Sequence, residues 1–207
     1  MSKRLFSLFI FMIFISGCAF TNNQVSTRKA RVVYYVPKTV DNEKVKDALL
    51  KAISLRTQNV KDLEEFMPER LPEKPGHPIG NNVLGNLDDI VLGNPKIEAA
   101  KLDVSNAWYK VEGTEEIGTP LDQKYVIYKG AIYPYKKGYK VYIYEFYQEG
   151  TAGIVGHITK AIEHSIIKEK TPLFFMTQIS KKFKEEVPEA KLESVSPISL
   201  KKTILNK

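Results

Sequence analysis

Cysteine is almost absent from this chain of 207 residues, which contains only Cys18. The chain can therefore form no internal disulfide, even in an oxidising compartment. Core packing has to stabilise the fold instead. Apolar residues make up 43% of the chain and charged residues 27%, a globular composition that supplies enough material for one core at this length.

A hydrophobic run long enough to cross a bilayer is also missing. The longest such run, from Leu5 to Ile15, has eleven residues and is interrupted only by Ser7, whereas a transmembrane helix needs about twenty. The run follows the basic pair Lys3 and Arg4, and a polar tract comes soon after it. These features predict an export signal rather than a permanent membrane span.

Catalytic signatures are likewise missing. The chain contains no Gly-x-Ser-x-Gly elbow, and no acid pair stands in a hydrolase context. We therefore expect no enzymatic activity and no cofactor.

The excess of positive charge is modest and scattered. The formal charge is +7, and Lys3 and Arg4 within the leader account for two of these charges. Lys181, Lys182 and Lys184 are followed directly by acidic residues, whereas nucleic-acid-binding proteins gather basic residues on one face. We expect no nucleic-acid partner; ordinary solubility charge and a loose attraction to anionic lipid headgroups both stay open.

The residues that end the leader, Ile15-Ser16-Gly17-Cys18, resemble the lipobox of bacterial lipoproteins. The resemblance covers residues 1–18 only. It implies cleavage before Cys18, thioether lipidation of its thiol, and acylation, as with palmitate, of the new amino group. The alternative is a plain secretory signal with a chance cysteine. No family is recognised for the mature domain.

The lipobox resemblance also predicts the location. Ala19, rather than Asp, follows the cysteine, which in Gram-negative lipoproteins favours transfer from the periplasm to the outer membrane. In a Gram-positive cell the domain would lie on the outer face of the cytoplasmic membrane. Either location is extracytoplasmic, in the cell envelope.

The chain is predicted to form one folded domain. Residues 1–17 are the signal peptide, residues 18–30 a lipidated tether with a mean span of about 20 Å, and residues 31–200 a single α+β domain. The domain contains a Pro/Gly-rich loop at about 67–95, which is either a partner-binding or lid segment or a floppy insertion.

Periodicity predicts the elements of the domain. Asp41 is the expected N-cap of an amphipathic helix that ends near Arg56, and a further helical turn or two is expected around Val60 to Phe66. The expected strands are Arg31 to Pro37, Lys101 to Val104, Ala107 to Glu112, Gln123 to Lys136, Tyr139 to Gln148 and, at an edge, Lys191 to Ser196. The expected later helices are Ala152 to Glu169 and Pro172 to Glu186, followed by a loose lysine-rich end. This order favours an α+β fold with a mainly antiparallel sheet and amphipathic helices packed against it.

Four groups of residues were considered as sites. The glycines Gly150, Gly153 and Gly156 lack the spacing of a nucleotide-binding turn and favour tight helix packing. His157, Glu163 and His164 share a predicted helix, but about 10 Å separates the histidines, so no metal site is expected. His77 is a lone loop histidine and is not expected to be catalytic.

The fourth group is a concentration of tyrosines on one hairpin, where sheet architecture is favoured over a binding face. Its members are Tyr125, Tyr128, Tyr133, Tyr135, Tyr139, Tyr142, Tyr144 and Tyr147.

Two functions remain open at this stage. The first is a non-enzymatic envelope lipoprotein that binds a protein partner or helps assemble an envelope complex. The second is a binding module for a lipid or other apolar ligand, held in a groove between sheet and helices.

Overall fold

The computed structural model describes residues 24–57, 59–80, 91–92, 94–119, 122–152 and 172–205. The described strands are β1 (Gln24–Pro37), β2 (Asn59–Glu64), β3 (Val91–Leu92), β4 (Tyr109–Thr119), β5 (Asp122–Tyr135), β6 (Gly138–Ala152) and β7 (Lys191–Ser196). The described helices are α2 (Asn42–Ser54), α3 (Pro95–Ala100), α5 (Pro172–Glu186) and α6 (Ile198–Leu205).

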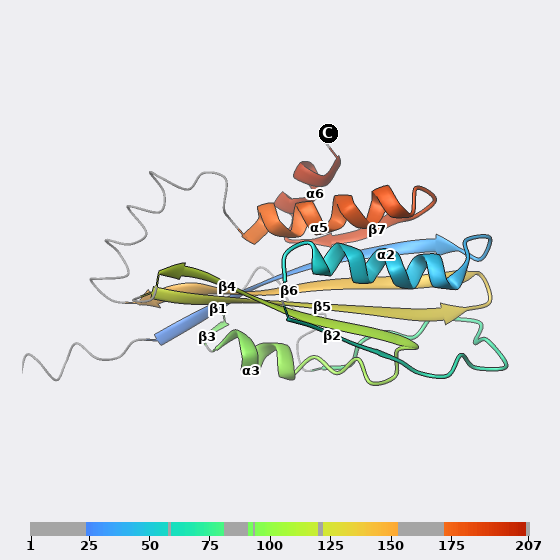
Figure 1. Cartoon of the computed structure of the whole chain (residues 1–207), viewed down its shortest axis with the longest axis horizontal. Helices are drawn as coiled ribbons and strands as arrows, with labels where there is room; N and C mark the ends of the chain where they lie inside the picture. Colours follow the sequence, from blue (N-terminus) through green and yellow to red (C-terminus); the bar gives the residue numbers. More distant parts are fainter. Residues whose placement is uncertain are drawn as a thin grey trace, which may run out of the picture.

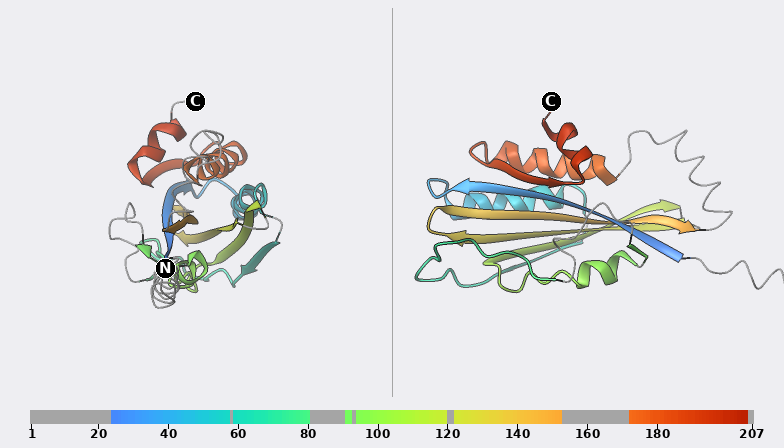
Figure 2. Two further views of the ribbon diagram at one scale, coloured as in Figure 1. Left: turned by 90° about the vertical axis from the view of Figure 1, so that its left-hand side faces the viewer. Right: turned by 180° about the vertical axis from the view of Figure 1, so that it is seen from behind.

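All the described strands form one antiparallel sheet. Its order is β2-β4-β5-β6-β1-β3, and β7 also pairs with β1. The helices pack against this sheet, which confirms the predicted α+β class. Helices α2 and α5 cover one face, called the inner face below, and α3 lies on the opposite, outer face (Figures 1 and 2).

The largest cluster of buried apolar residues lies between the inner face and the two helices. Helix α2 contributes Val45, Leu49 and Ile53, and α5 contributes Ile179 and Phe183, all fully buried. Five such side chains from two helices represent several kcal/mol of apolar burial, at about 1.5–3 kcal/mol each. Packing of this kind can stabilise a chain that lacks disulfides.

Strand β6 is central, as its pattern predicts. It pairs with β5 on one side and β1 on the other. Val141 and Ile143 are buried on the inner face, and Tyr144 and Phe146 are buried beneath α3 on the outer face. The β5–β6 turn also lies where predicted, because Gly138 has a φ of 147° and a Cβ there would lie 2.1 Å from the Val36 carbonyl oxygen.

The tyrosine concentration is architectural. Tyr128, Tyr133, Tyr135, Tyr144 and Tyr147 are buried, and Tyr125, Tyr139 and Tyr142 are partly buried. Tyr142 stacks on Tyr144, with ring centroids 6.2 Å apart. Because none of the eight is exposed, they do not form a binding face.

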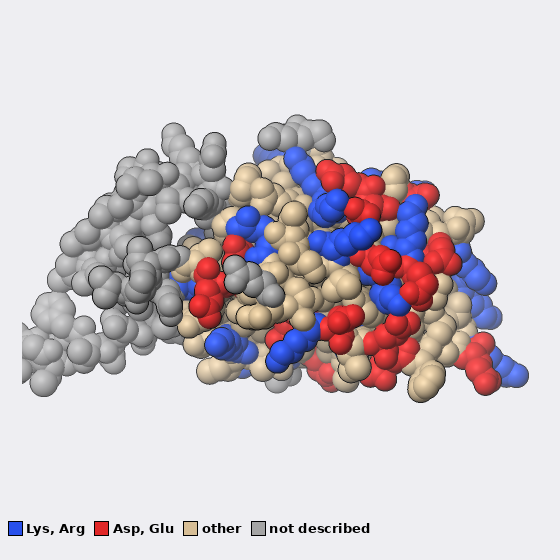
Figure 3. Space-filling model, in the orientation of Figure 1, with Lys and Arg blue, Asp and Glu red and all other residues tan. Residues whose placement is uncertain are grey.

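Charged side chains of both signs are interspersed on the face that carries α2 and β2 (Figure 3). Many of them form ion pairs across elements, such as Arg56 with Glu115 at 2.6 Å and Lys110 with Glu65 at 2.8 Å. Exposed pairs such as Lys110–Glu65 contribute at most about 1 kcal/mol each, whereas the Arg56–Glu115 pair is partly buried. The pattern is that of a solvated surface, in agreement with the scattered lysines of the sequence.

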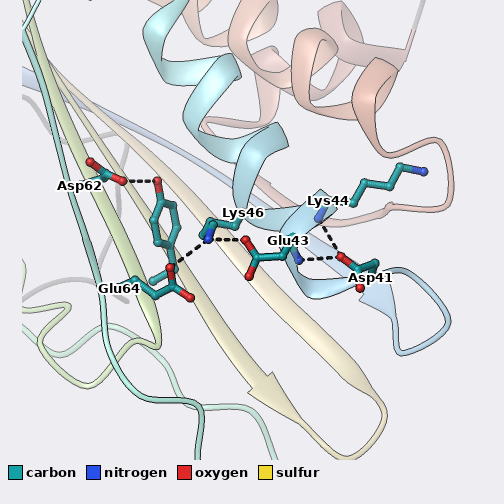
Figure 4. Close-up of polar contacts among 7 residues, drawn as sticks. Asp41, Glu43, Lys44, Lys46, Asp62 and Glu64 are labelled. Atoms are coloured by element: carbon teal, nitrogen blue, oxygen red, sulfur yellow. Dashed lines mark hydrogen bonds and ion pairs between the residues drawn. The ribbon is translucent and has the colours of Figure 1, made fainter.

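Helix α2 begins at its predicted cap. The Asp41 carboxylate accepts hydrogen bonds from the backbone N–H groups of Glu43, at 2.9 Å, and Lys44, at 3.3 Å (Figure 4). We expect Asp41→Ala to lower the free energy of unfolding by about 1 kcal/mol, because two N–H groups lose their acceptor. Asp41→Asn should retain most of that stability in the same denaturant titration. Equal losses in the two variants would show that the cap contributes nothing.

The start of the fold differs from the prediction. Strand β1 begins at Gln24, so residues 24–30, predicted as part of the tether, pair with β6. These residues were predicted as tether because they are polar. In the structure the polar residues belong to the strand: Thr27 is fully buried, and the ammonium group of Lys29 lies 2.7 Å from the Glu98 carboxylate.

Residues 59–64 form strand β2 instead of the predicted helical turn. These residues form a strand because every one of them pairs with β4. Their own sequence pattern does not predict a strand, since they are mostly exposed and show little periodicity. Residues 101–104 do not form the predicted strand and contribute only one bridge, between Ile79 and Asp103. The Asp103 carboxylate accepts a hydrogen bond from the Ser105 backbone N–H at 2.7 Å, and this local turn competes with strand formation.

Three other predicted elements need correction. Strand β4 begins two residues late and continues to Thr119, and Ala152 lies in β6 rather than in a helix. The lysine-rich end forms α6, because Leu200 is fully buried while Lys201 and Lys202 face solvent. Helix α5 and strand β7 have the predicted bounds.

Candidate functional site

The described part of the sheet has an open edge at β2. This strand pairs with β4 on one side, and on its other side it pairs with no strand in the described part of the chain. Leu63 on this strand is 54% exposed, and Phe66, two residues beyond its end, is fully exposed. A strand with one unpaired row of N–H and C=O groups is a template for pairing with another chain.

Strand β2 is held firmly on its inner side. The ammonium group of Lys46 on α2 bonds the Glu64 carboxylate at 2.9 Å and also pairs with Glu43 (Figure 4). The Tyr109 hydroxyl donates to Asp62 at 3.1 Å. Burial, followed by the nearby Asp62 charge, raises the pKa of Tyr109, so this donor remains protonated. The two acids of β2 are thus fixed by neighbouring elements, and the open edge is presented on a rigid support.

The charges of β2 disfavour pairing with a second copy of itself. Two-fold symmetric, antiparallel pairing within one sheet places a central residue opposite its own copy. Near the middle of β2 that residue is Lys61 or Asp62. Like charges directly opposite each other are destabilising, so the edge is better suited to a different chain.

A second unusual feature is a buried acid, Glu145, on the inner face of β6. Its side chain is 1% exposed, and neither carboxyl oxygen has a hydrogen-bond partner of good geometry among the described residues. It lies opposite Tyr128 on β5 and Ala30 on β1. A buried polar group without a partner is costly, so its presence requires a physical explanation.

Burial raises the pKa of Glu145 well above its ordinary value, and the negative charge of Glu115 raises it further. The Met176 backbone amide and the Arg56 charge act in the opposite direction and do not offset this rise. The protonated form is therefore strongly favoured. A neutral buried carboxyl group is one hydrogen-bond donor with acceptor capacity left over.

The groups around Glu145 are already paired with one another. The Arg56 guanidinium bonds Glu115 at 2.6 Å and lies 4.2 Å from the centre of the Phe175 ring. The Tyr128 hydroxyl donates to the other oxygen of Glu115 at 3.2 Å. Glu115 is thus paired with both Arg56 and Tyr128, whereas no side chain of this cluster hydrogen-bonds the Glu145 carboxyl group.

Glu145 is not among the residues predicted from the sequence. Its position carried a signal, because Tyr139, Val141, Ile143 and Tyr147 occupy the same face of the strand and Glu145 falls between them in that alternation. A single acid on an otherwise apolar strand face is a reason to expect a buried ionisable group.

Six of the residues considered from the sequence lie outside the described part of the chain. These are Cys18, Gly153, Gly156, His157, Glu163 and His164. Gly150 lies within β6. His77 lies in the 67–80 segment, where its carbonyl oxygen accepts a hydrogen bond from the Asn106 amide at 3.3 Å; this segment is remote in sequence from the elements that form the Glu145 cluster.

Within the described ranges, no three acidic, histidine or cysteine side chains are grouped closely enough to hold a metal ion. No helix in those ranges is long and apolar enough to cross a membrane.

Comparisons with known proteins found no match. No family model, no curated protein and no solved structure resembles this chain significantly.

Proposed function

We propose that this protein is a lipid-anchored, extracytoplasmic lipoprotein of the bacterial cell envelope, attached to its membrane through Cys18, and that it binds a partner protein along β2 without catalysing a reaction. The observation that carries the binding role is the open edge of β2 with Leu63 and Phe66 exposed beside it. The lipobox-like residues that end at Cys18 support the anchor.

The partner would add an extended segment to β2. Main-chain hydrogen bonds along the six residues of β2 would supply affinity, and apolar side chains against Leu63 and Phe66 would supply specificity. Leu63 lies on a strand whose neighbouring acids are held by Lys46 and Tyr109, and Phe66 follows two residues after the end of that strand. A rigid surface of this kind reduces the entropy lost on binding.

Site-specific photocrosslinking in intact cells tests this role. A photoreactive residue at Leu63 or Phe66 should give one discrete crosslinked product, whereas one at Ile198, which is 73% exposed on α6, should not. Against the purified partner, Leu63→Asp should weaken binding about tenfold or more, as expected for an anchor residue. Ile198→Asp, the matched control, should leave affinity unchanged. Equal products from all three positions, or equal affinities, would refute a role for β2.

A second function is favoured by one observation, the unpartnered Glu145 between β6 and the first turns of α5. A protein that binds a lipid or other apolar ligand needs a few polar groups within an apolar interior, and a neutral Glu145 would be one. Native mass spectrometry of the mature protein tests this: a ligand should appear as mass beyond that of the acylated chain. That mass should be lost in Glu145→Leu. A spectrum without additional mass would contradict ligand binding.

A further inference from the structure

The length of chain between the proposed anchor and the fold restricts how the domain can stand on its membrane. Five residues separate Cys18 from Gln24, the first residue of β1. Even a fully extended chain spans only about 20 Å over these six steps. The start of β1 is therefore tied close to the bilayer, on the condition that Cys18 carries the anchor as proposed above.

The sheet is long compared with this link. Strand β1 has 14 residues, which at about 3.3 Å per residue gives roughly 45 Å. The end of the sheet at Gln24 is called the near end, and the end at Pro37 the far end. Residues at the near end must lie close to the membrane, whereas residues at the far end can lie roughly 45 Å farther away.

Helix α3 lies at the near end. It begins three residues after β3, which pairs with β1 at Ser26 and Thr27, and Glu98 of α3 bonds Lys29. The Lys96 ammonium group lies 4.5 Å from the centre of the Tyr125 ring, near the start of β5. Figure 1 shows α3 beneath the sheet on the side toward the start of β1.

The outward side of α3 combines basic and apolar groups and presents no acid. Lys96 and Ile97 are exposed, Ile97 by 59%, and the Lys101 side chain is 55% exposed. The only acid of the helix, Glu98, points inward, with 2% of its side chain exposed.

Glu98 is neutralised by lysines. Burial acts to raise the pKa of Glu98, but hydrogen bonds from Lys101 and Lys29 lower it below its ordinary value, so the carboxylate is ionised. Three lysines accompany this one acid, so the net charge of the four residues is +2. The lysines are Lys29, Lys96 and Lys101. Exposed acids nearby are Glu116 on β4, opposite Tyr125, and Asp103, two residues after Lys101. The basic groups that face outward at α3 itself are Lys96 and, directly after the helix, Lys101.

We infer that the outward side of α3 contacts the lipid surface to which the protein is anchored, with Ile97 at the headgroup boundary and Lys96 and Lys101 among anionic headgroups. Each basic residue near an anionic surface strengthens such a contact, and one exposed apolar side chain between lysines fits the interface between headgroups and acyl chains. The contacts of the lysines and of Ile97 are each weak, but they are enough to orient the domain, because the proposed acyl anchor already holds it at the surface.

Most of β2 is displaced from α3 along the direction of the strands. The register across β1, β6, β5, β4 and β2 places Asn59 level with Lys29 and Glu64 level with Tyr34. Strand β2 thus runs from the level of α3 toward the far end, and Phe66 lies beyond its last residue. Leu63 and Phe66, proposed to bind the partner protein, are therefore displaced from the proposed lipid contact toward the far end.

Fluorescence quenching on vesicles tests the inference with the full mature protein. Cys18 is the only natural cysteine and is blocked when acylated, so a cysteine introduced at Ile97 or at Leu63 can be labelled alone. The acylated protein is reconstituted into phosphatidylcholine vesicles with or without phosphatidylglycerol, containing lipids with a nitroxide near the headgroup. Both substituted positions are more than half exposed, so the label should not disturb the fold.

We expect the label at Ile97 to lose most of its fluorescence and the label at Leu63 to lose little. Replacing both Lys96 and Lys101 with Glu should restore much of the Ile97 signal on vesicles that contain phosphatidylglycerol, while the protein still floats with them. Equal quenching at both positions, or none at either, in protein that floats with the vesicles would overturn the inference and leave the anchor intact. Protein that does not float with the vesicles would refute the anchor, and the inference with it.

Discussion

Replacing Glu145 with Gln is expected to stabilise the protein, by an amount that grows with pH. Gln has the shape of the protonated carboxyl group and never ionises. In the native protein, burial raises the pKa of Glu145 well above 4.5, its ordinary value. The folded protein must therefore bind a proton that the unfolded chain releases above that pH.

The sign of the effect follows from this difference in bound protons. Below the ordinary pKa, Glu145 is protonated in both states, so its contribution to stability is complete and independent of pH. As the pH rises from the ordinary to the raised pKa, the native protein loses about 1.4 kcal/mol of unfolding free energy per pH unit through this group. Glu145→Gln removes that loss, so the two proteins should be similar at acid pH and should diverge as pH increases.

Denaturant titrations across this pH range measure the difference. The charged groups that face Glu145 are Glu115 on β4 and Arg56 after α2, with Tyr128 on β5 as a neutral hydroxyl. All three are present in both proteins, so their own titration largely cancels in the comparison. Glu116→Gln, which removes an exposed acid of β4, is the matched control and should follow the native protein at every pH. Parallel curves for native protein and Glu145→Gln would mean that Glu145 is ionised in the folded state.

The elements with strong local patterns could be predicted from the sequence. Helix α2 has a cap at Asp41 and apolar residues at helical spacing, and β5 and β6 combine β-branched and aromatic residues with a glycine turn at Gly138. In each case the local preference and the tertiary packing agree. Helix α5 was predicted for the same reason, since Ile179 and Phe183 share the side that packs on the sheet.

The elements that were missed depend on partners distant in sequence. Residues 24–30 and 59–64 are polar and read as a tether and a helical turn, yet they pair with β6 and β4. Pairing partners 45 or more residues away leave no trace in local composition. Helix α3 was missed for a related reason, because it is only six residues long and its stability depends on Pro95, Glu98 and Ala99, which it buries against the sheet.

The candidate site was predictable only in part. The sequence analysis favoured a protein partner without being able to locate it, because an open sheet edge exists only once the order of the strands is known. Phe66 was assigned to a helical turn, where it would have been expected to pack inward; in the structure it follows β2 and is fully exposed. Glu145 was predictable in principle from the alternation in β6, since the residues that share its face are apolar or aromatic.

The proposed anchor and the inferred orientation together would restrict where this protein can act. A domain tied at Gln24 and contacting lipid through α3 presents β2 toward partners that are fixed in, or close to, the same membrane. A soluble partner would have to approach the envelope to bind. Loss of the anchor should therefore reduce partner crosslinking at Leu63 even though the β2 edge itself is unchanged.

The largest expected effect belongs to Cys18, on which both the proposed location and the inferred orientation of the domain depend. Its thiol is the only one in the chain that can receive a lipid. Cys18→Ser should abolish lipidation, because a hydroxyl group cannot replace the thiolate. The variant should appear as an unprocessed precursor, because the lipobox resemblance implies that cleavage follows lipidation. Residues 24–205 are untouched, so its fold should be native.

Metabolic labelling with palmitate in cells that express the full chain tests this central claim most directly. The native protein should incorporate label and Cys18→Ser should incorporate none, with equal amounts of both proteins on an immunoblot. Ser16→Ala, which keeps a small residue in the lipobox, is the matched control and should be labelled like the native protein. Equal labelling of native protein and Cys18→Ser, or no labelling of either, would contradict the account.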